Sequence, residues 1–170
     1  TEWGVPVREE RRHFEFVVLE GAQAGLSWIT ILKRRDGYRR AFVNFDPDKV
    51  ARFTEEDVAR LKADSGIIRN ERKIRSAISN AQAFLRIQEE FGSFDSYIWR
   101  FVDGKPIVNH FGTTEEVPAE TELSRTLSRE LKQRGFSFVG PTIMYAHMPS
   151  TGMVNVHLTS CFRHSEVQRL

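Results

Sequence analysis

The apolar positions of the chain are spaced for helices joined by short turns. Apolar and small residues recur three or four positions apart, which places them on one face of a helix. The longest such stretch spans residues 70–91, and its predicted buried face consists of Ile74, Ala77, Ile78, Ala81, Phe84 and Leu85. An earlier stretch consists of Phe14, Val17, Val18 and Gly21, leads to Ala24 and is broken by Gly25. No segment alternates convincingly between apolar and polar residues, so we predict no strand.

Turn and capping residues mark further helices. Asp46 before Pro47 is typical of a helix start, as is Thr54 with Asp57 three residues later. A second helix is expected to carry Leu26, Ile29 and Leu32 and, after Gly37, Tyr38 and Phe42. Further helices are expected over residues 54–66, 94–101 and 123–135, and one more follows Pro141. Residues 103–121 hold glycine, prolines, threonines and acids, and are predicted to form one long loop. The expected fold is all-α, with a single domain over residues 1–170.

Composition limits the classes of protein to which the chain can belong. Hydrophobic residues make up 40% and charged residues 28% of its 170 residues. No apolar run approaches the roughly 18 residues that span a bilayer. The sequence therefore indicates a globular protein rather than a disordered or membrane one. The net charge of +2 is too small to indicate a general nucleic-acid-binding surface, so any DNA site must be a local patch.

The single cysteine and the first residues bear on the location of the protein. Cys161 is the only cysteine, which excludes an internal disulfide framework and favours the reducing cytoplasm. Its first residues do not have the pattern of a signal peptide, so we expect none. It opens on Thr1 without an initiator methionine, so we expect that a short upstream segment is missing.

A glycine-bracketed turn between two predicted helices is the first candidate for function. Gly135 and Gly140 flank this hairpin, residues 135–142, and Pro141 follows the second glycine. Such a turn exposes backbone N–H groups at the start of the next helix, which suit a phosphate oxygen. The segment resembles the helix–hairpin–helix of DNA repair proteins, which binds the duplex backbone without reading bases. The alternative is an ordinary helical hairpin ended by glycine.

Several segments together resemble the family of DNA-3-methyladenine glycosylase I, a constitutive bacterial repair enzyme. They are residues 2–6, 19–28, 66–69 with 73–74, 134–140 and 152–157, and they occur in family order over nearly the whole chain. The resemblance implies the helix–hairpin–helix glycosylase fold. It also implies base flipping in alkylated double-stranded DNA and hydrolysis of the N-glycosidic bond of 3-methyladenine. We expect a monomer.

The resemblance also assigns the base pocket. Glu20 is the candidate catalytic residue and base recogniser, because a carboxylate can accept a hydrogen bond from the adenine amino group and favour positive charge. Trp28 is expected to stack on the cationic ring, and Trp3 is expected to join it in binding the base. The alternatives are a solvated helix carboxylate at Glu20 and plain core packing for Trp28.

Two segments are the expected DNA contacts. In the turn after the first helix, Leu26 is the candidate wedge in the base stack and Gln23 a contact to the orphaned base, with Gly25 between them. Alternatively, Gly25 merely joins two helices and Leu26 belongs to the core. Expected contacts in or beside the hairpin are Arg134, Val139, Gly140 and Thr142. Basic clusters at residues 33–40 and 69–75 are weaker candidates for phosphate contacts.

Two absent residue types favour a glycosylase that does not cleave the backbone. Relatives that nick DNA place a lysine just after the hairpin, where this chain has Pro141 and Thr142. Asn155 stands where most relatives carry a catalytic aspartate, and a neutral amide does not stabilise a sugar cation as a carboxylate does. The expected enzyme is monofunctional. Val156 departs from the acidic residue typical of the family, and this change has no mechanistic explanation.

His157 and Cys161 have the spacing of two zinc ligands on one helical turn. The family binds one structural zinc with this pair and with a Cys and a His from an upstream segment that this sequence lacks. Two ligands do not close a tetrahedral site, and His164 is the nearest further donor in the sequence. Zinc is therefore expected in a longer parent chain. The alternative is a lone thiol beside a helix-terminal histidine.

Two rival functions remain at this stage. One is a non-catalytic or degenerate DNA-binding member of the same family, because the missing upstream segment supplies pocket residues in the family. The other is a glycosylase that removes a different alkylated base.

Overall fold

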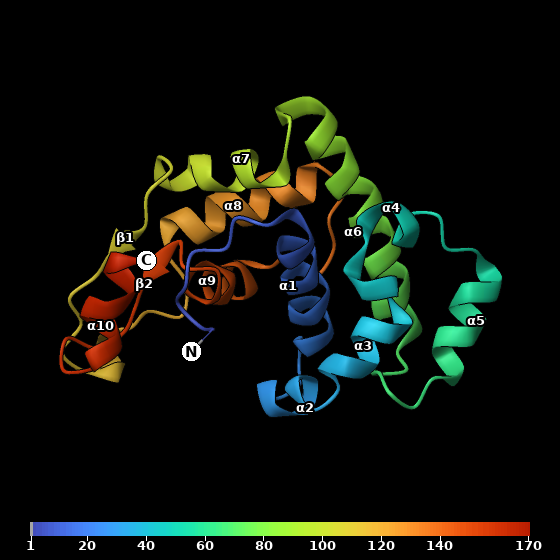
Figure 1. Ribbon diagram of the computed structural model, residues 1–170, viewed down its shortest axis with the longest axis horizontal. Coiled ribbons are helices and arrows are strands. Elements are labelled where there is room, and N and C mark those ends of the chain that lie inside the picture. The colour runs from blue at the N-terminus through green and yellow to red at the C-terminus, as the bar shows by residue number, and fades with distance from the viewer. Residues whose placement is uncertain (1) are drawn as a thin grey trace.

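The computed structural model describes residues 2–170 and is built mainly of helices (Figure 1). The helices are α1 (Glu10–Gln23), α2 (Trp28–Leu32), α3 (Arg35–Ala41), α4 (Pro47–Val50), α5 (Glu55–Ala63), α6 (Glu71–Phe91), α7 (Phe94–Trp99), α8 (Glu122–Gln133), α9 (Pro141–Ser150) and α10 (Phe162–Glu166). Short 3₁₀ turns lie at Val43–Phe45, Arg100–Val102, Thr114–Glu116 and Val167–Arg169. The predicted all-α fold is confirmed. In the described part of the chain, no helix has the length and apolar character needed to cross a bilayer.

The structure adds one small strand pair that the sequence did not predict. Strand β1 (Ile107–Val108) runs parallel to β2 (Val154–Asn155), with a hydrogen bond from Ile107 N to Met153 O of 2.9 Å. The prediction of no strand was wrong because two residues are too few to show an alternating pattern. Strand β1 lies inside the predicted loop 103–121, and its pairing with β2 ties that loop to the segment after α9.

The predicted helix starts are confirmed by their capping hydrogen bonds. Thr54 N donates to Asp57 Oδ2 at 2.9 Å, and Asp46 Oδ1 accepts from Lys49 N at 3.3 Å. Asn70 caps α6 by accepting from Lys73 N at 3.1 Å. These bonds satisfy N–H groups that have no acceptor inside their own helix. Local sequence therefore determines where these helices begin.

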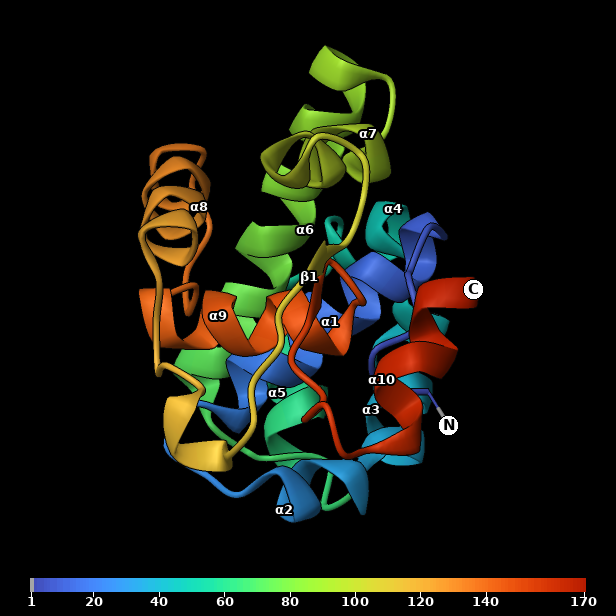
Figure 2. The same cartoon turned by 90° about the vertical axis from the view of Figure 1, so that its left-hand side faces the viewer.

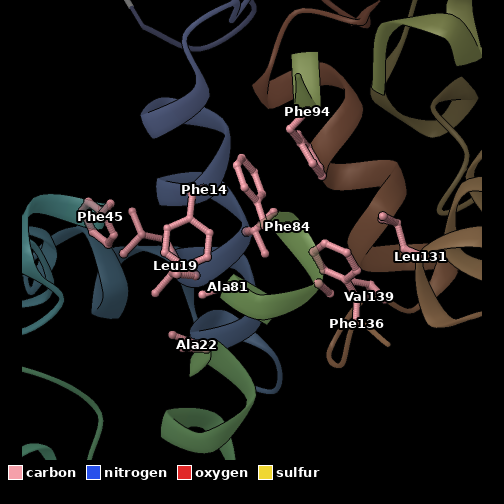
Figure 3. Close-up of a cluster of buried hydrophobic side chains, with 14 of the residues drawn as sticks. Phe14, Leu19, Ala22, Phe45, Ala81, Phe84, Phe94, Leu131, Phe136 and Val139 are labelled. Carbon is pink, nitrogen blue, oxygen red and sulfur yellow. The ribbon is translucent and has the colours of Figure 1, made fainter. Parts of the chain in front are cut away.

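Helix α1 lies at the centre of the molecule, with α8 and α9 on one side and α3 to α6 on the other (Figure 1). It packs against α2, α6, α7 and α9. The core between α1 and α6 is aromatic, and the ring of Phe84 lies 5.4 Å from that of Phe14 and 4.3 Å from that of Phe94 (Figure 3). Phe136 extends this cluster towards α8, so the core also anchors the hairpin.

The single helix predicted to carry Leu26 to Phe42 is in fact two, α2 and α3, and the apolar residues around α2 are less buried than their spacing predicts. Ile29 is 57% exposed, Leu32 51% and Leu26 37%, whereas Ile31 is fully buried. A helix of five residues can direct only a narrow face into the core, so its other apolar side chains remain at the surface. On α6, Ile78 and Leu85 are only partly buried, and Ile87 is fully buried instead. Figure 2 shows α2 at one end of the molecule, below α1 and α9.

The N-terminal segment docks on the end of α9. Val7 N donates to Thr151 O at 2.9 Å, and Trp99 Nε1 donates to Val7 O at 2.9 Å. Gly152 has a φ of +74°, and a Cβ placed there would lie 2.5 Å from the backbone nitrogen of Pro6. Only glycine fits both the left-handed backbone and this close approach. Gly152 therefore allows the segment that carries Trp3 to lie against the molecule.

We expect Gly152→Ala to destabilise the protein more than Gly104→Ala. Both glycines have a φ of +74°, but a Cβ at Gly104 meets no atom within 4 Å. The shared backbone strain costs about 1–2 kcal/mol, and the clash at Gly152 adds roughly 1–3 kcal/mol. Urea denaturation measures both free energies of unfolding. Equal losses in the two variants would show that the close approach to Pro6 is not a constraint.

Candidate functional site

A pocket of about 400 Å³ lies between the N-terminal segment and helices α1, α2, α3 and α9. Its lining is mostly apolar and consists of Glu2, Trp3, Glu15, Phe16, Leu19, Trp28, Leu32, Arg35, Ala146, Pro149 and Ser150. Trp3 and Trp28 are distant in sequence, and the structure brings both to this pocket. Trp28 packs against the core and also lines the pocket. It can therefore contact a ligand as well as stabilise the core. The two indoles give the pocket flat aromatic surface.

Acidic and basic side chains form a cluster of ion pairs at the edge of this pocket. The guanidinium of Arg35 donates to both carboxylate oxygens of Glu2 at 2.7 Å and, through Nε, to Glu15 at 2.7 Å. Arg12 also donates to Glu2. The hydrogen bond from Arg35 lowers the pKa of Glu2 below its ordinary value. Sequence reasoning missed this cluster because it took Arg35 as part of a basic run that could contact phosphate.

Glu20 is buried directly behind the pocket wall. It is 1% exposed, so the alternative of a solvated carboxylate is wrong. Its Oε2 lies 2.7 Å from Nδ1 of His147, and its Oε1 accepts from the Ser150 hydroxyl at 2.9 Å. Ser150 lines the pocket, as does the preceding residue of α1, Leu19. His147 and Ser150 were not predicted, because they lie in a mostly apolar helix and have no local motif.

The turn that follows α1 is held from two sides. Gln23 Nε2 donates to Leu26 O at 2.5 Å, and Gly25 has a φ of +77°. The ammonium of Lys73 donates to Ala22 O at 2.8 Å and to Ala24 O at 2.6 Å. These bonds fix the end of α1 and leave Leu26 at the surface. The alternative that placed Leu26 in the core is therefore wrong.

The hairpin lies between α8 and α9, as predicted, and α6 holds it in place. The buried amide of Asn80 donates to Ser137 O at 3.0 Å and accepts from Ser137 N at 2.8 Å. Gly140 has a φ of −61°, so no left-handed backbone requires a glycine there. Phe138 takes a left-handed conformation instead, with a φ of +57°. Sequence patterns gave no sign of Asn80, because its partners lie on another element.

The predicted hairpin contacts differ in what they present to solvent. Val139 is 2% exposed and its side chain is in the core, so only its backbone is available (Figure 3). Thr142 is exposed in the first turn of α9, where the leading N–H groups have no acceptor within the helix. Gly140 adjoins this turn and leaves open space around its Cα. The hairpin therefore offers backbone N–H groups and a hydroxyl at its surface.

Arg134 is not among the residues that line the groove beside the hairpin, and its predicted contact to DNA stays a prediction. Its guanidinium pairs with Glu90 at 2.6 Å and lies over the rings of Phe91 and Tyr97 at 4.9 and 5.0 Å. The groove is lined instead by Arg72, Arg75 and Lys132, together with Glu71, Ser76, Ser79, Ser137, Phe138, Val139 and Gly140. The sequence could not indicate which of these cations has a partner.

Two of the groove cations carry no ion pair. Arg75 pairs with Glu55 and Glu71, whereas Arg72 and Lys132 form no ion pair within residues 2–170. The guanidinium of Arg72 lies 5.4 Å from the centre of the Phe138 ring. Their positive charge therefore faces the groove without an acidic neighbour bound to it.

His157 and Cys161 lie together, with 4.0 Å between Nδ1 and Sγ. Within residues 2–170, no group of three or more His, Cys, Asp or Glu side chains is arranged to hold a metal ion. This pair alone does not fit a closed tetrahedral zinc site. The ring of His157 contacts the ring of Trp3, with 4.6 Å between their centres.

Asn155 is a structural residue outside the pocket. Its Nδ2 donates to His164 O at 2.9 Å, and its Oδ1 accepts from His157 N at 3.1 Å. It is not among the residues that line the pocket. The side chain ties the segment after β2 to α10, so its position gives no sign of a role in chemistry.

Comparison with known proteins identifies the family to which this fold belongs. Residues 1–164 match the methyladenine glycosylase family, and the chain belongs to it. It is 49% identical to DNA-3-methyladenine glycosylase 1 of Escherichia coli K12, over 95% of this chain and 86% of that protein. It is 46% identical to DNA-3-methyladenine glycosylase of Haemophilus influenzae, over 94% and 86%. The family resemblance drawn from the sequence is confirmed.

Solved structures agree with the fold. A crystal structure of 3-methyladenine DNA glycosylase I matches with a TM-score of 0.92 and 48% identity, over 95% of this chain and 89% of that one. The Staphylococcus aureus enzyme, whose structure is described as the basis of 3-methyladenine recognition, matches with a TM-score of 0.92 and 34% identity, over 94% and 85%.

We expect Asn80→Ala to loosen the hairpin without unfolding the protein. The Ser137 amide loses its acceptor, so its hydrogen exchange measured by NMR should become faster. Gln82→Ala is the matched control, because it removes a similar amide–carbonyl bond from α6 to Ala51 on another side of that helix. Unchanged exchange of the Ser137 amide in Asn80→Ala would contradict the anchoring role.

Proposed function

We propose that this chain is a DNA repair glycosylase that hydrolyses the N-glycosidic bond of 3-methyladenine in DNA. The observation that carries the proposal is the largely apolar pocket that Trp3 and Trp28 both line. Membership of the methyladenine glycosylase family supports it, as do relatives named DNA-3-methyladenine glycosylase.

The chemistry of the lesion suits such a pocket. 3-Methyladenine in DNA is a cationic base, and its glycosidic bond is already weak because the base leaves as a neutral molecule. Indole faces attract cations, so Trp3 and Trp28 bind the flipped base and retain its charge. The carboxylate of Glu20 lies behind the wall in a low-dielectric setting, which strengthens its attraction for a cation. Water then attacks the sugar carbon.

The duplex would contact two neighbouring segments. Leu26 is exposed at the turn after α1 and can fill the gap that the flipped base leaves. The exposed start of α9 at Thr142 presents N–H groups to a phosphate. Arg72 and Lys132 supply positive charge in the adjoining groove, in addition to the predicted contact of Arg134. These contacts hold the backbone and carry no sequence information.

The pocket also supports a monofunctional reaction. A lyase needs an amine that attacks the sugar and forms an imine. Within residues 2–170, no lysine lines the pocket. The ammonium of Lys73, on the helix behind the turn, donates to two backbone carbonyls and so is engaged in structure. Zinc at His157 and Cys161, a monomeric state and a cytoplasmic location stay predictions.

The function is tested by incubating the chain with DNA that carries 3-methyladenine. We expect release of the free base, identified by chromatography, and an intact abasic strand. With abasic DNA and borohydride, we expect no covalent adduct on a denaturing gel. Binding of DNA without base release would indicate a degenerate, non-catalytic member of the family. Release of another alkylated base would indicate that the substrate is that base. An adduct abolished by one lysine substitution would contradict the monofunctional mechanism.

We expect Trp28→Ala to weaken binding of free 3-methyladenine by roughly 1–3 kcal/mol, because a stacking surface is lost. Titration followed by NMR shifts measures the affinity. Ile29→Ala is the matched control, since Ile29 lies on the same helix, is exposed and does not line the pocket. Unchanged affinity in Trp28→Ala, or an equal loss in the control, would remove Trp28 from the base site.

A further inference from the structure

The N-terminal segment that carries Trp3 forms one side of the pocket and packs loosely there. Trp3 is 44% exposed, although it lines the pocket. Its ring contacts the ring of His157 edge-on, with 4.6 Å between their centres. Its backbone oxygen accepts from Arg163 at 3.4 Å, which is long for a hydrogen bond. These contacts and the partial burial leave much of the position of the indole to be fixed by its neighbours in the chain.

The residue before Trp3 is held much more tightly. Both carboxylate oxygens of Glu2 accept from Arg35, through Nη1 and Nη2 at 2.7 Å each, and Glu2 also accepts from Arg12. Two parallel bonds between a guanidinium and a carboxylate are strong, and they fix direction as well as distance. The pair of Glu2 and Arg35 is therefore a clasp that ties the N-terminal segment to α3.

Arg35 is itself held in position by the fold. Its Nε donates at 2.7 Å to Glu15, which lies on α1 and is 6% exposed. A guanidinium bound to a buried carboxylate presents its remaining nitrogens in a fixed direction, so little freedom is lost when Glu2 binds. The Arg35 side chain is 23% exposed. Water therefore screens the clasp less than it screens an ion pair on an open surface, which contributes little.

Building on the proposed function, we infer that Arg35 is a positioning residue that holds Trp3 at the base pocket by binding Glu2. The contacts run from Glu15 on α1 through Arg35 on α3 to Glu2, the chain neighbour of Trp3. All three guanidinium nitrogens of Arg35 donate to carboxylates, so its effect on the base is exerted through Trp3. This role differs from the phosphate contact considered for the basic cluster at residues 33–40.

The test makes two measurements on Glu2→Gln, which removes the charge of the clasp and keeps the side-chain volume. NMR relaxation without ligand gives the order parameter of the Trp3 amide, which we expect to fall from about 0.85, the value of rigid backbone, to below about 0.6. The affinity for free 3-methyladenine should fall about tenfold, as for a lost stacking surface. Arg35→Lys keeps the charge but cannot form two parallel bonds, so both quantities should change in the same direction.

Two further variants distinguish positioning from a general effect on the fold. In Trp3→Ala, adding Glu2→Gln should weaken binding no further, because the clasp acts through the missing indole. Arg39→Gln is the matched control. Arg39 donates to the same carboxylate of Glu15 at 3.4 Å, but it neither bonds to Glu2 nor lines the pocket. This control should leave the order of Trp3 and the affinity unchanged.

Different outcomes bear on the clasp and on the proposed function. An unchanged order parameter or an unchanged affinity in Glu2→Gln overturns the inference and leaves the proposed function in place. A loss that adds fully to that of Trp3→Ala also overturns it, because Glu2 would then act on the base by another route. If Glu2→Gln releases Trp3 but the unaltered chain neither binds 3-methyladenine nor releases it from DNA, the clasp stands and the proposed function falls.

Discussion

Burial of ionisable side chains on one helix constrains the arrangement of the whole molecule. Helix α1 carries His13, Glu15 and Glu20 inside the fold, and a buried charge is costly unless it has a partner. Each partner comes from a different element. Asp95 of α7 lies 3.0 Å from His13, Arg35 of α3 pairs with Glu15, and α9 supplies the groups around Glu20. These pairings place three helices around α1, and the pocket forms where α3 and α9 meet it.

Burial on α1 also affects the protonation of His13. Burial lowers the pKa of His13 below its ordinary value, against the opposing effect of its bond to Asp95. The unfolded chain therefore binds this proton more readily than the folded one. The stabilisation that the buried His13 contributes is complete above the ordinary histidine pKa and is lost as the pH falls towards the lowered folded value. Packing of α1 therefore favours the neutral form of His13.

What could be predicted from the sequence was local. The α6 helix, the capped starts at Asp46 and Thr54 and the hairpin position all follow from residues close together in the chain. The tryptophans came from family resemblance, because spacing alone does not distinguish a stacking surface from core. Ser150 and the pairing of Arg134 with Glu90 depend on helices far apart in sequence. No local pattern indicates which cations are already paired, so the basic clusters alone could not show which residues are free to contact a phosphate.

Helix α6 fixes the distance between two surface segments. Lys73 holds the turn after α1 and Asn80 holds the hairpin, two turns apart on the same helix. At about 1.5 Å per residue, the helix sets the two anchor points roughly 10 Å apart. One inserted residue between them would rotate one anchor by about 100° relative to the other. The loops of this fold can therefore vary in length, while this part of α6 must keep its register for both segments to face one duplex.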